Sequence, residues 1–203
     1  MRRGSSLLVL ALGLLGSSAA WAVTYNEAVN GDLSGDRNAP TALVLAVGSN
    51  PITATSAAGD IEYFRLTLPP GGRLSAINVV SSTSTSLSFI AVQPGTTFTE
   101  PPTGTVVSHL LGYAHFGPGN GTVGANILGN MGVGAGAIGF VPPLVASDYT
   151  FWSQETSSVA STYKLDFVVT QASPAPLGRT AAAALALALL MLGAWRLRRR
   201  ARA

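Results

Sequence analysis

Hydrophobic and polar residues alternate in short stretches through the middle of the chain. In the clearest stretch, residues 61–68, Phe64 and Leu66 alternate with Arg65 and Thr67. Successive side chains of a β-strand point to opposite faces, so this alternation predicts a strand with one mainly apolar face.

Similar runs rich in Val, Ile, Thr, Phe and Tyr recur, separated by Gly, Pro, Asn and Asp. They cover residues 41–47, 74–81, 87–93, 149–154 and 163–170, with a Pro-Pro-Gly-Gly turn at 69–72. No amphipathic run of helical length occurs between residues 23 and 172. Short strands at this spacing predict an all-β domain over residues 23–172, an antiparallel β-sandwich or jelly roll.

Two segments interrupt the strand pattern. Residues 112–139 contain ten glycines, which disfavour the interiors of strands and helices for reasons of backbone entropy. We expect a long surface loop there, with a helical turn near residues 127–131. Such a loop is either a binding feature or a mobile insertion. The polar run 81–86 is either a bulged edge strand or a loop.

The two ends of the chain have a different pattern. Arg2 and Arg3 precede an apolar stretch at residues 7–16, and Ala20-Trp21-Ala22 provides a small-x-small cleavage sequence. This predicts a secretory signal peptide over residues 1–22. The alternative is a short N-terminal membrane anchor, which the length of the apolar stretch disfavours.

Near the C-terminus, residues 181–195 carry no charge, which predicts a transmembrane helix over residues 180–197. A basic cytoplasmic anchor follows, formed by Arg196, Arg198, Arg199, Arg200 and Arg202. Basic residues stay on the cytoplasmic side of a membrane, so the domain at 23–172 is expected outside it. A buried core helix is disfavoured because the run is apolar on all faces.

Composition and charge narrow the class of protein. Charged residues make up only 10% of the chain, against roughly 25% in soluble domains. The chain has no cysteine, which excludes disulfides, thiolate zinc sites and a cysteine nucleophile. Residues 23–172 contain four basic and nine acidic side chains, a net charge of −5. Such a domain repels phosphate, so nucleic acid is not expected as a partner.

The segment before the predicted helix contains Pro174, Ala175 and Pro176. A short proline motif, one apolar helix and a terminal arginine cluster resemble the PEP-CTERM class of bacterial sorting signals. This resemblance covers residues 173–203 and implies processing by an exosortase-type membrane protease. The chain departs from the class at Ala175, where the class has Glu. The alternative is a plain C-terminal anchor that is never cut.

A second resemblance rests on residues 59–74 (GDIEYFRLTLPPGGRL), 147–152 (SDYTFW) and 163–165 (YKL). They are similar to the strands and turn of bacterial pre-peptidase C-terminal domains, which are small jelly-roll sandwiches attached to secreted enzymes. The resemblance implies binding or stabilisation rather than catalysis. The glycine-rich segment is not part of that family's usual pattern.

The best candidate metal ligands are Asp32, Asp36, Asp60 and Glu62. Hard oxygen ligands suit calcium, which is abundant outside the cell. The resemblance to pre-peptidase C-terminal domains also implies calcium near this end, since some relatives bind it there. The EF-hand spacing is absent, and the alternative is that these aspartates stabilise turns.

Other candidate site residues are aromatic or histidine. Tyr149 and Trp152 could line a carbohydrate-binding face, although the alternation also fits core positions. His109 and His115 lack helical metal-ligand spacing and a third ligand. No Gly-x-Ser-x-Gly elbow and no phosphate loop occur, so a hydrolase is the least favoured hypothesis.

The sequence therefore predicts an exported cell-surface protein that is not an enzyme. Its β-sandwich would be structural or adhesive, and calcium is the one cofactor considered. The expected partners are the membrane, an exosortase-type protease and extracellular polysaccharide. The alternative function is a carbohydrate- or peptide-binding module.

Overall fold

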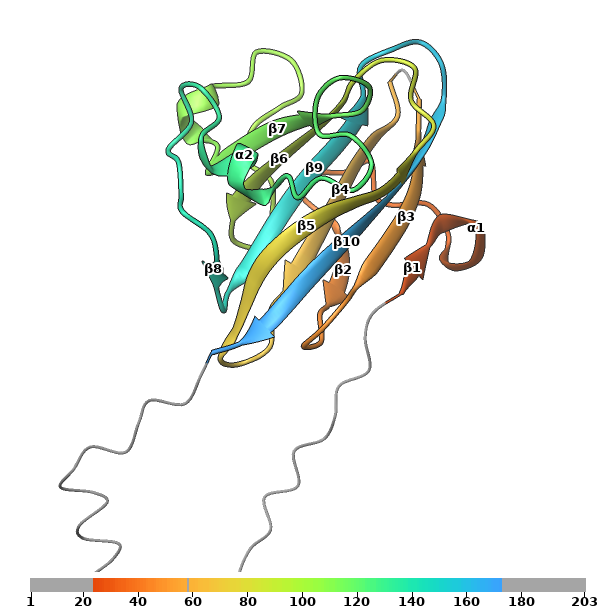
Figure 1. The fold of residues 1–203 in the computed structure, drawn as a ribbon. Helices are drawn as coiled ribbons and strands as arrows, with labels where there is room; N and C mark the ends of the chain where they lie inside the picture. Colours follow the sequence, from red (N-terminus) through yellow and green to blue (C-terminus); the bar gives the residue numbers. More distant parts are fainter. Residues whose placement is uncertain (1–23, 58, 173–203) are drawn as a thin grey trace, which may run out of the picture. The chain divides into compact units, whose positions relative to one another are not determined.

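Residues 24–57 and 59–172 are described by a computed structural model, in which they form two five-stranded β-sheets packed face to face (Figure 1). Sheet A contains, in spatial order, β1 (Tyr25–Asn26), β3 (Pro51–Ser56), β10 (Ser161–Gln171), β5 (Gly72–Ser82) and β8 (Leu144–Val145). Sheet B contains, in spatial order, β2 (Thr41–Val44), β4 (Ile61–Thr67), β9 (Asp148–Glu155), β6 (Ser88–Pro94) and β7 (Gly112–Phe116). The predicted all-β sandwich is confirmed.

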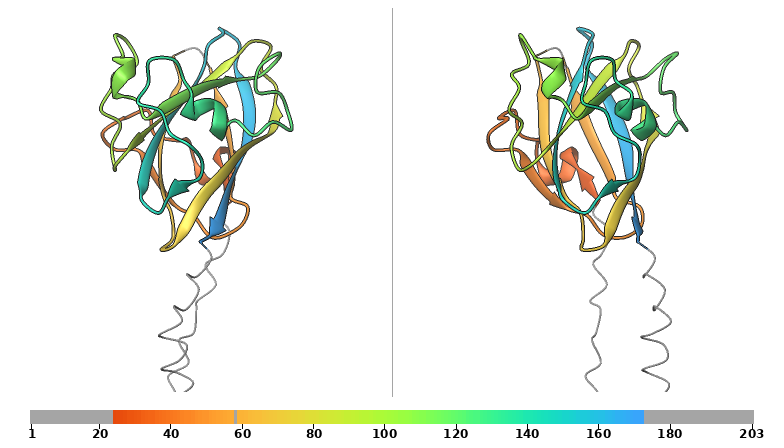
Figure 2. Two further views of the ribbon diagram at one scale, coloured as in Figure 1. Left: turned by 60° about the vertical axis from the view of Figure 1, so that its left-hand side comes forward. Right: turned by 90° about the vertical axis from the view of Figure 1, so that its left-hand side faces the viewer.

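Short helical segments lie between the strands. They are α1 (Glu27–Asn30), the 3₁₀ helix η1 (Val107–His109) and α2 (Leu128–Gly132). Helix α2 lies beside β5 and β7, one strand from each sheet (Figures 1 and 2). Its Leu128 and Met131 side chains pack into the core between the sheets. The helix therefore covers one edge of the sandwich.

Two strand pairs are parallel, which corrects the expectation of purely antiparallel sheets. β1 pairs with β3 and β2 pairs with β4 in parallel register, and the remaining pairs of these strands are antiparallel. Strands β1 to β4 alternate between the two sheets. A chain that reverses at each crossing brings strands two apart in sequence side by side in the same direction, which explains both parallel pairs.

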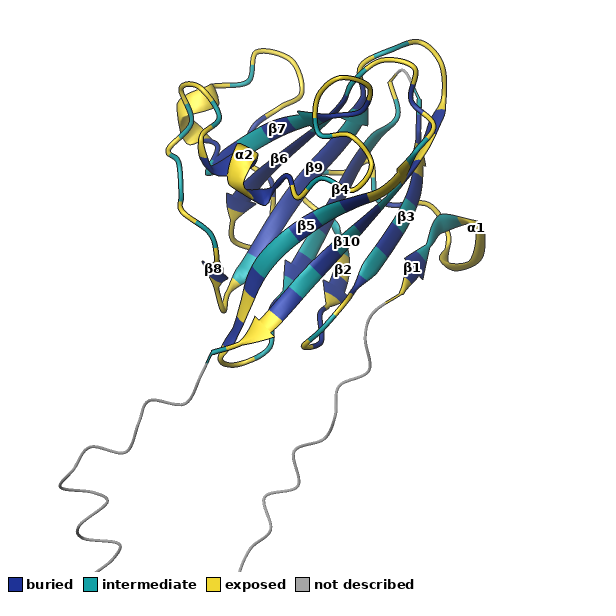
Figure 3. Cartoon of the chain, viewed as in Figure 1, coloured by how far each residue is buried: buried dark blue, intermediate teal, exposed yellow. Residues whose placement is uncertain are grey.

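The core between the sheets follows the alternation seen in the sequence. In β10 every second residue from Tyr163 to Val169 is buried (Figure 3). Phe64 on β4 stacks on Phe151 of β9 with ring centroids 5.4 Å apart, and Phe167 of β10 meets both rings edge-on. Contacts between aromatic side chains of both sheets thus form the centre of the core.

The glycine-rich segment is largely the surface loop expected from its composition, except that its first five residues form a strand. It begins with β7 and contains α2, one residue from the predicted helical turn. A Cβ at Gly112 would lie less than 3.0 Å from the Met131 carbonyl oxygen, and a Cβ at Gly132 equally close to the Phe140 carbonyl oxygen. These glycines let β7, α2 and the chain after it approach closely.

The predicted end segments lie outside the described residues. They are the signal peptide at 1–22, the proline motif at 174–176 and the transmembrane helix at 180–197 with its arginines. Within residues 24–57 and 59–172, no helix is long and apolar enough to cross a membrane. The described chain begins and ends at the same end of the sandwich (Figure 2).

Candidate functional sites

Three carboxyl groups converge where the N-terminal segment meets β4. Oxygen atoms of Glu27, Asp32 and Glu62 lie within 4.8 Å of one another. Glu27 is the first residue of α1, Asp32 follows that helix, and Glu62 is the second residue of β4. We call these three residues the acidic cluster. The structure brings together two of the predicted calcium ligands, Asp32 and Glu62, and adds Glu27.

Local hydrogen bonds hold Glu27 in place. Asn26 caps α1, since its side chain accepts a hydrogen bond from the Ala28 amide at 3.1 Å. The Glu27 carboxylate then accepts from the Leu33 amide at 3.1 Å and from the Thr55 amide of β3 at 2.5 Å. Glu27 therefore links the N-terminal segment to sheet A while lying beside Glu62 of sheet B.

Glu62 is the unusual member of the acidic cluster. Its exposed fraction is 0%, and neither carboxyl oxygen accepts a hydrogen bond. In the described residues, no Lys or Arg side chain forms an ion pair with this cluster. A buried carboxylate without donors or a cation is costly in free energy, so it keeps a proton or requires a positive ion.

The acidity of the cluster reflects this environment. Burial raises the pKa of Glu62 to about 9, and the negative charges of Glu27, Asp60 and Asp32 contribute to the rise, as does the hydrogen bond that a protonated Glu62 donates to the Glu27 carboxylate. Burial also raises the pKa of Glu27, although its two amide hydrogen bonds oppose that effect. Without a cation, Glu62 therefore carries a proton at neutral pH.

The spacing of the cluster suits calcium. Calcium–oxygen distances are about 2.3–2.6 Å, so two oxygens on opposite sides of one ion lie roughly 5 Å apart. The candidate ligand oxygens of the acidic cluster all lie within 4.8 Å of one another, which is inside this limit. The cluster offers three carboxylate ligands, and water or main-chain carbonyls would complete the coordination.

The other two predicted calcium ligands, Asp36 and Asp60, are not among the three converging residues. Asp36 accepts a hydrogen bond from the Asn38 amide at 2.9 Å, which is a turn-stabilising contact. Asp60 is not one of the three converging residues, but its charge acts on Glu62. Burial and the charge of Asp32 raise the pKa of Asp60.

A second set of side chains covers the outer face of sheet B. The buried residues Tyr63, Ala91, Phe98, Leu110 and Trp152 form a cluster separate from the main core. Trp152 stands between Tyr63 and Ala91 across β4, β9 and β6. Phe98 and Leu110 come from the β6–β7 connection, which folds over this face. We call these five residues the outer cluster.

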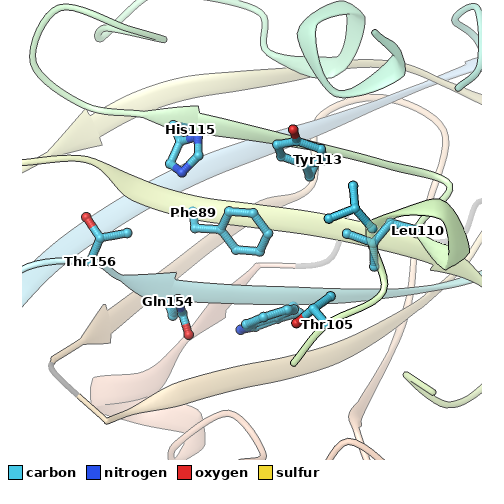
Figure 4. A pocket seen from close by; sticks show the side chains of 9 residues that line it. Phe89, Thr105, Leu110, Tyr113, His115, Gln154 and Thr156 are labelled. Atoms are coloured by element: carbon cyan, nitrogen blue, oxygen red, sulfur yellow. The ribbon is translucent and has the colours of Figure 1, made fainter. Parts of the chain in front are cut away.

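A pocket of about 230 Å³ opens beside the outer cluster. Its lining comes from β6, β7, β9, the residue after β9 and the chain before β7, and Figure 4 shows side chains from these segments around one space. The lining residues are Phe89, Thr105, Val107, Leu110, Tyr113, His115, Trp152, Gln154 and Thr156. We call this the outer pocket.

The two predicted ligand-binding aromatics face opposite sides of sheet B. Trp152 lines the outer pocket, and its ring centroid lies 4.9 Å from that of Phe89. The Trp152 side chain is 3% exposed, and its indole Nε1 has no hydrogen-bond partner. Tyr149 belongs to the core between the sheets, where its hydroxyl donates to the Val145 carbonyl at 3.1 Å.

The two histidines lie in unrelated environments. His109 Nδ1 is 2.7 Å from Glu100 Oε1, and its side chain is largely exposed. Hydrogen bonds from the Val106 amide and from His109 lower the pKa of Glu100. His115 packs edge-on against Phe89 in the outer pocket. In residues 24–57 and 59–172, no serine or threonine hydroxyl forms a hydrogen bond with either imidazole.

Comparison with known proteins identifies no family for this chain. No family model matches it, and no curated protein or solved structure is significantly similar to it. The sorting-signal and pre-peptidase C-terminal resemblances therefore stay expectations.

Proposed function

We propose that this chain is an exported, non-catalytic cell-surface protein with a structural or adhesive β-sandwich stabilised by calcium. The observation that carries the proposal is the complete burial of Glu62 beside Glu27 and Asp32, with no donor to either oxygen. A calcium ion would replace the proton on Glu62 and balance the remaining charge. The domain would be a jelly-roll sandwich of the kind that the pre-peptidase C-terminal resemblance implies.

The export part of the proposal rests on the sequence. Residues 1–22 have the pattern of a signal peptide, and residues 173–203 have that of a sorting or anchor segment. The partners would be the membrane, an exosortase-type protease and, after processing, extracellular polysaccharide. The absence of enzymatic activity is proposed because neither histidine is paired with a nucleophile in the described residues.

The position of the acidic cluster gives calcium a mechanical role. Glu27 and Asp32 belong to the first residues of the domain, whereas Glu62 belongs to β4, an internal strand of sheet B. An ion held by all three would fasten the N-terminal segment to the sandwich. Extracellular calcium sites commonly bind with Kd of about 10⁻⁴–10⁻³ M, so such a clamp would be filled outside the cell and empty in the cytoplasm.

Thermal unfolding with and without calcium tests this proposal. With Kd of about 10⁻⁴ M, 10 mM calcium would stabilise the fold by about 2.7 kcal/mol. That corresponds to a rise in Tm of about 5–10 °C for a domain of this size. Glu62→Gln should remove the rise, because it deletes the only fully buried carboxylate of the cluster.

Asp36→Asn is the matched control. It changes an acidic residue of the same segment that lies outside the converging set, so its response to calcium should equal that of the parent protein. Magnesium at the same concentration controls for ionic strength and should have a smaller effect. An unchanged Tm in calcium, or a full response in Glu62→Gln, would contradict a calcium clamp.

A further inference from the structure

We infer that the outer pocket binds one ring of a neutral pyranose sugar. This goes beyond the proposed function, and it does not depend on calcium. The acidic cluster includes Glu62, which shares the inner side of β4 with the core residue Phe64. The outer pocket lies on the opposite face of sheet B.

The size of the outer pocket limits the ligand to a single ring. Its volume is about 230 Å³, below the roughly 300–1,000 Å³ typical of sites for drug-sized molecules. A monosaccharide unit is of the right order, whereas an oligosaccharide would extend beyond the pocket over the surface.

Aromatic side chains give the outer pocket an apolar surface. Phe89 lies between Trp152 and Tyr113, with ring centroids 4.9 Å and 5.9 Å away respectively. His115 of β7 is paired directly with Phe89 of β6, and the centroids of the two rings lie 5.5 Å apart. The C–H face of a pyranose is apolar and flat, so it can pack on such a surface while its hydroxyls point sideways.

One buried donor requires an acceptor at this place. Trp152 Nε1 is inaccessible and unpaired in the structure, although the residue lines the outer pocket. Buried N–H groups are almost always paired, and leaving one unpaired costs free energy. Because Nε1 is inaccessible, a sugar hydroxyl oxygen can accept its hydrogen bond only after a neighbouring lining side chain moves aside.

The remaining polar lining determines the charge of the ligand. Gln154, Thr105 and Thr156 can donate and accept hydrogen bonds, and no Asp, Glu, Lys or Arg lines the outer pocket. A charged ligand would lose its hydration without gaining a counter-charge, so a neutral sugar is favoured. An apolar peptide side chain would leave Gln154 and the Trp152 N–H without partners, which makes it the weaker fit.

Saturation-transfer NMR on the full chain tests this inference, with the protein held in a detergent that contains no sugar. The probes are the methyl glycosides of glucose, galactose, mannose and N-acetylglucosamine, and N-acetylleucinamide represents a peptide side chain. At least one glycoside should bind with Kd on the order of 1 mM, the affinity expected for about a dozen heavy atoms. Saturation should be strongest at the ring C–H protons that face the aromatic surface.

Two conservative variants locate the binding. Gln154→Met keeps the shape of a half-exposed side chain but removes its hydrogen bonds, and Trp152→Phe removes the indole N–H. Each should weaken glycoside binding roughly three- to tenfold. Gln171→Met is the matched control, because Gln171 lies at the end of β10 in sheet A, away from the outer pocket, and should leave Kd unchanged.

Three results would overturn the inference. They are no saturable binding of any glycoside, equal binding by Gln154→Met, Trp152→Phe and the parent protein, or binding of N-acetylleucinamide that Gln154→Met strengthens. The last result would identify an apolar peptide side chain as the ligand. Failure here is distinguishable from failure of the calcium proposal, because Gln154→Met should keep the full calcium-dependent rise in Tm.

Discussion

At the scale of the residue, Glu62 is an acidic side chain at a position of β4 that faces the core between the sheets. It shares the inner face of β4 with Phe64 and Leu66, which are completely buried apolar residues. An apolar residue there would pack without electrostatic cost. Glu62 therefore makes physical sense only together with the carboxyl groups of Glu27 and Asp32 and a positive partner, either a proton or a metal ion.

The protonation of Glu62 predicts a pH dependence of stability when calcium is removed by a chelator. Its folded-state pKa of about 9 exceeds the ordinary value of 4.5, so the native state holds a proton that the unfolded chain releases. Stability should therefore fall as pH rises from about 5 to 9. The pKa values of Glu27 and Asp60 are raised and act in the same direction, whereas those of Glu100 and Glu155 are lowered, so their contributions change below this range.

Urea unfolding at pH 5, 7 and 9 in a chelator measures this dependence. The parent protein should lose stability across the series, and Glu62→Gln should lose much less. Calcium should restore stability most at pH 9, because it competes with the proton for Glu62. A stability that stays level or increases from pH 5 to 9 in the chelator would show that Glu62 is ionised without a cation.

Residue-level patterns identified part of each candidate site. The sequence predicts Asp32 and Glu62 as candidate oxygen ligands but not Glu27, because nothing in its local sequence shows that its side chain reaches Glu62 of β4. Trp152 was recognised as a candidate aromatic ligand-binding residue. Phe89 and Gln154 were not, since they become its neighbours only through the pairing of β6 with β9. Both candidate sites are formed by contacts between segments that are distant in the sequence. The spacing of residues along the chain does not show which distant segments meet.

At the scale of the element, alternation predicts strands well where one face is strongly apolar. β4, β9 and β10 lie close to the predicted ranges, whereas β3 (Pro51–Ser56) was missed because its sequence, PITATS, places the small Ala54 beside Ile52 on the buried face. With Ile52 as its one large apolar residue, this strand lacks the repeated alternation of apolar and polar residues that predicts a strand. The parallel pairs also escape prediction, because they depend on which sheet each strand joins.

The close packing of α2 predicts unequal effects of two glycine substitutions in one helix. A Cβ at Gly132 would collide with the Phe140 carbonyl oxygen, whereas a Cβ at Gly129 meets nothing within 4 Å. Gly132→Ala should therefore lower the free energy of unfolding by about 1–3 kcal/mol, as expected for overpacking. Gly129→Ala should be neutral or slightly stabilising, since alanine favours helix.

Thermal unfolding of the two variants gives a direct comparison. Gly132→Ala should lower Tm by several degrees, at about 2–4 °C per kcal/mol for a protein of this size. Gly129→Ala, as the matched control, should not lower it. Equal Tm values would mean that the glycine-rich segment packs loosely, as expected for a surface loop.

At the scale of the whole molecule, the two candidate sites would serve different purposes. The acidic cluster joins the start of the domain to β4, so calcium there would act on folding and on resistance to unfolding. The outer pocket is formed by β6, β7, β9, the residue after β9 and the chain before β7, and it opens to the surface. Stabilisation by extracellular calcium and binding of a sugar would both suit a protein that functions outside the cell.

The ends of the chain predict what happens to the molecule in its host. Mass spectrometry of the mature protein should find Val23 at the N-terminus and no residues 181–195, with the protein in the surface or extracellular fraction. Ala175→Glu restores the residue found in the sorting class, so it should increase the processed fraction. Replacing both Pro174 and Pro176 by alanine should retain the tail, whereas Ser173→Ala, the neighbouring control, should not.

Export and C-terminal processing are tested separately by this experiment. A mature protein that keeps residues 1–22 in the cytoplasmic fraction would contradict export, and with it the need for an extracellular calcium site. A protein that begins at Val23 but keeps its arginine-rich end in the membrane fraction would contradict processing alone. Export would then stand, and the departure at Ala175 would explain why the protease leaves this tail uncut. In that case the sandwich would meet its ligand as a membrane-anchored domain rather than as a released matrix protein.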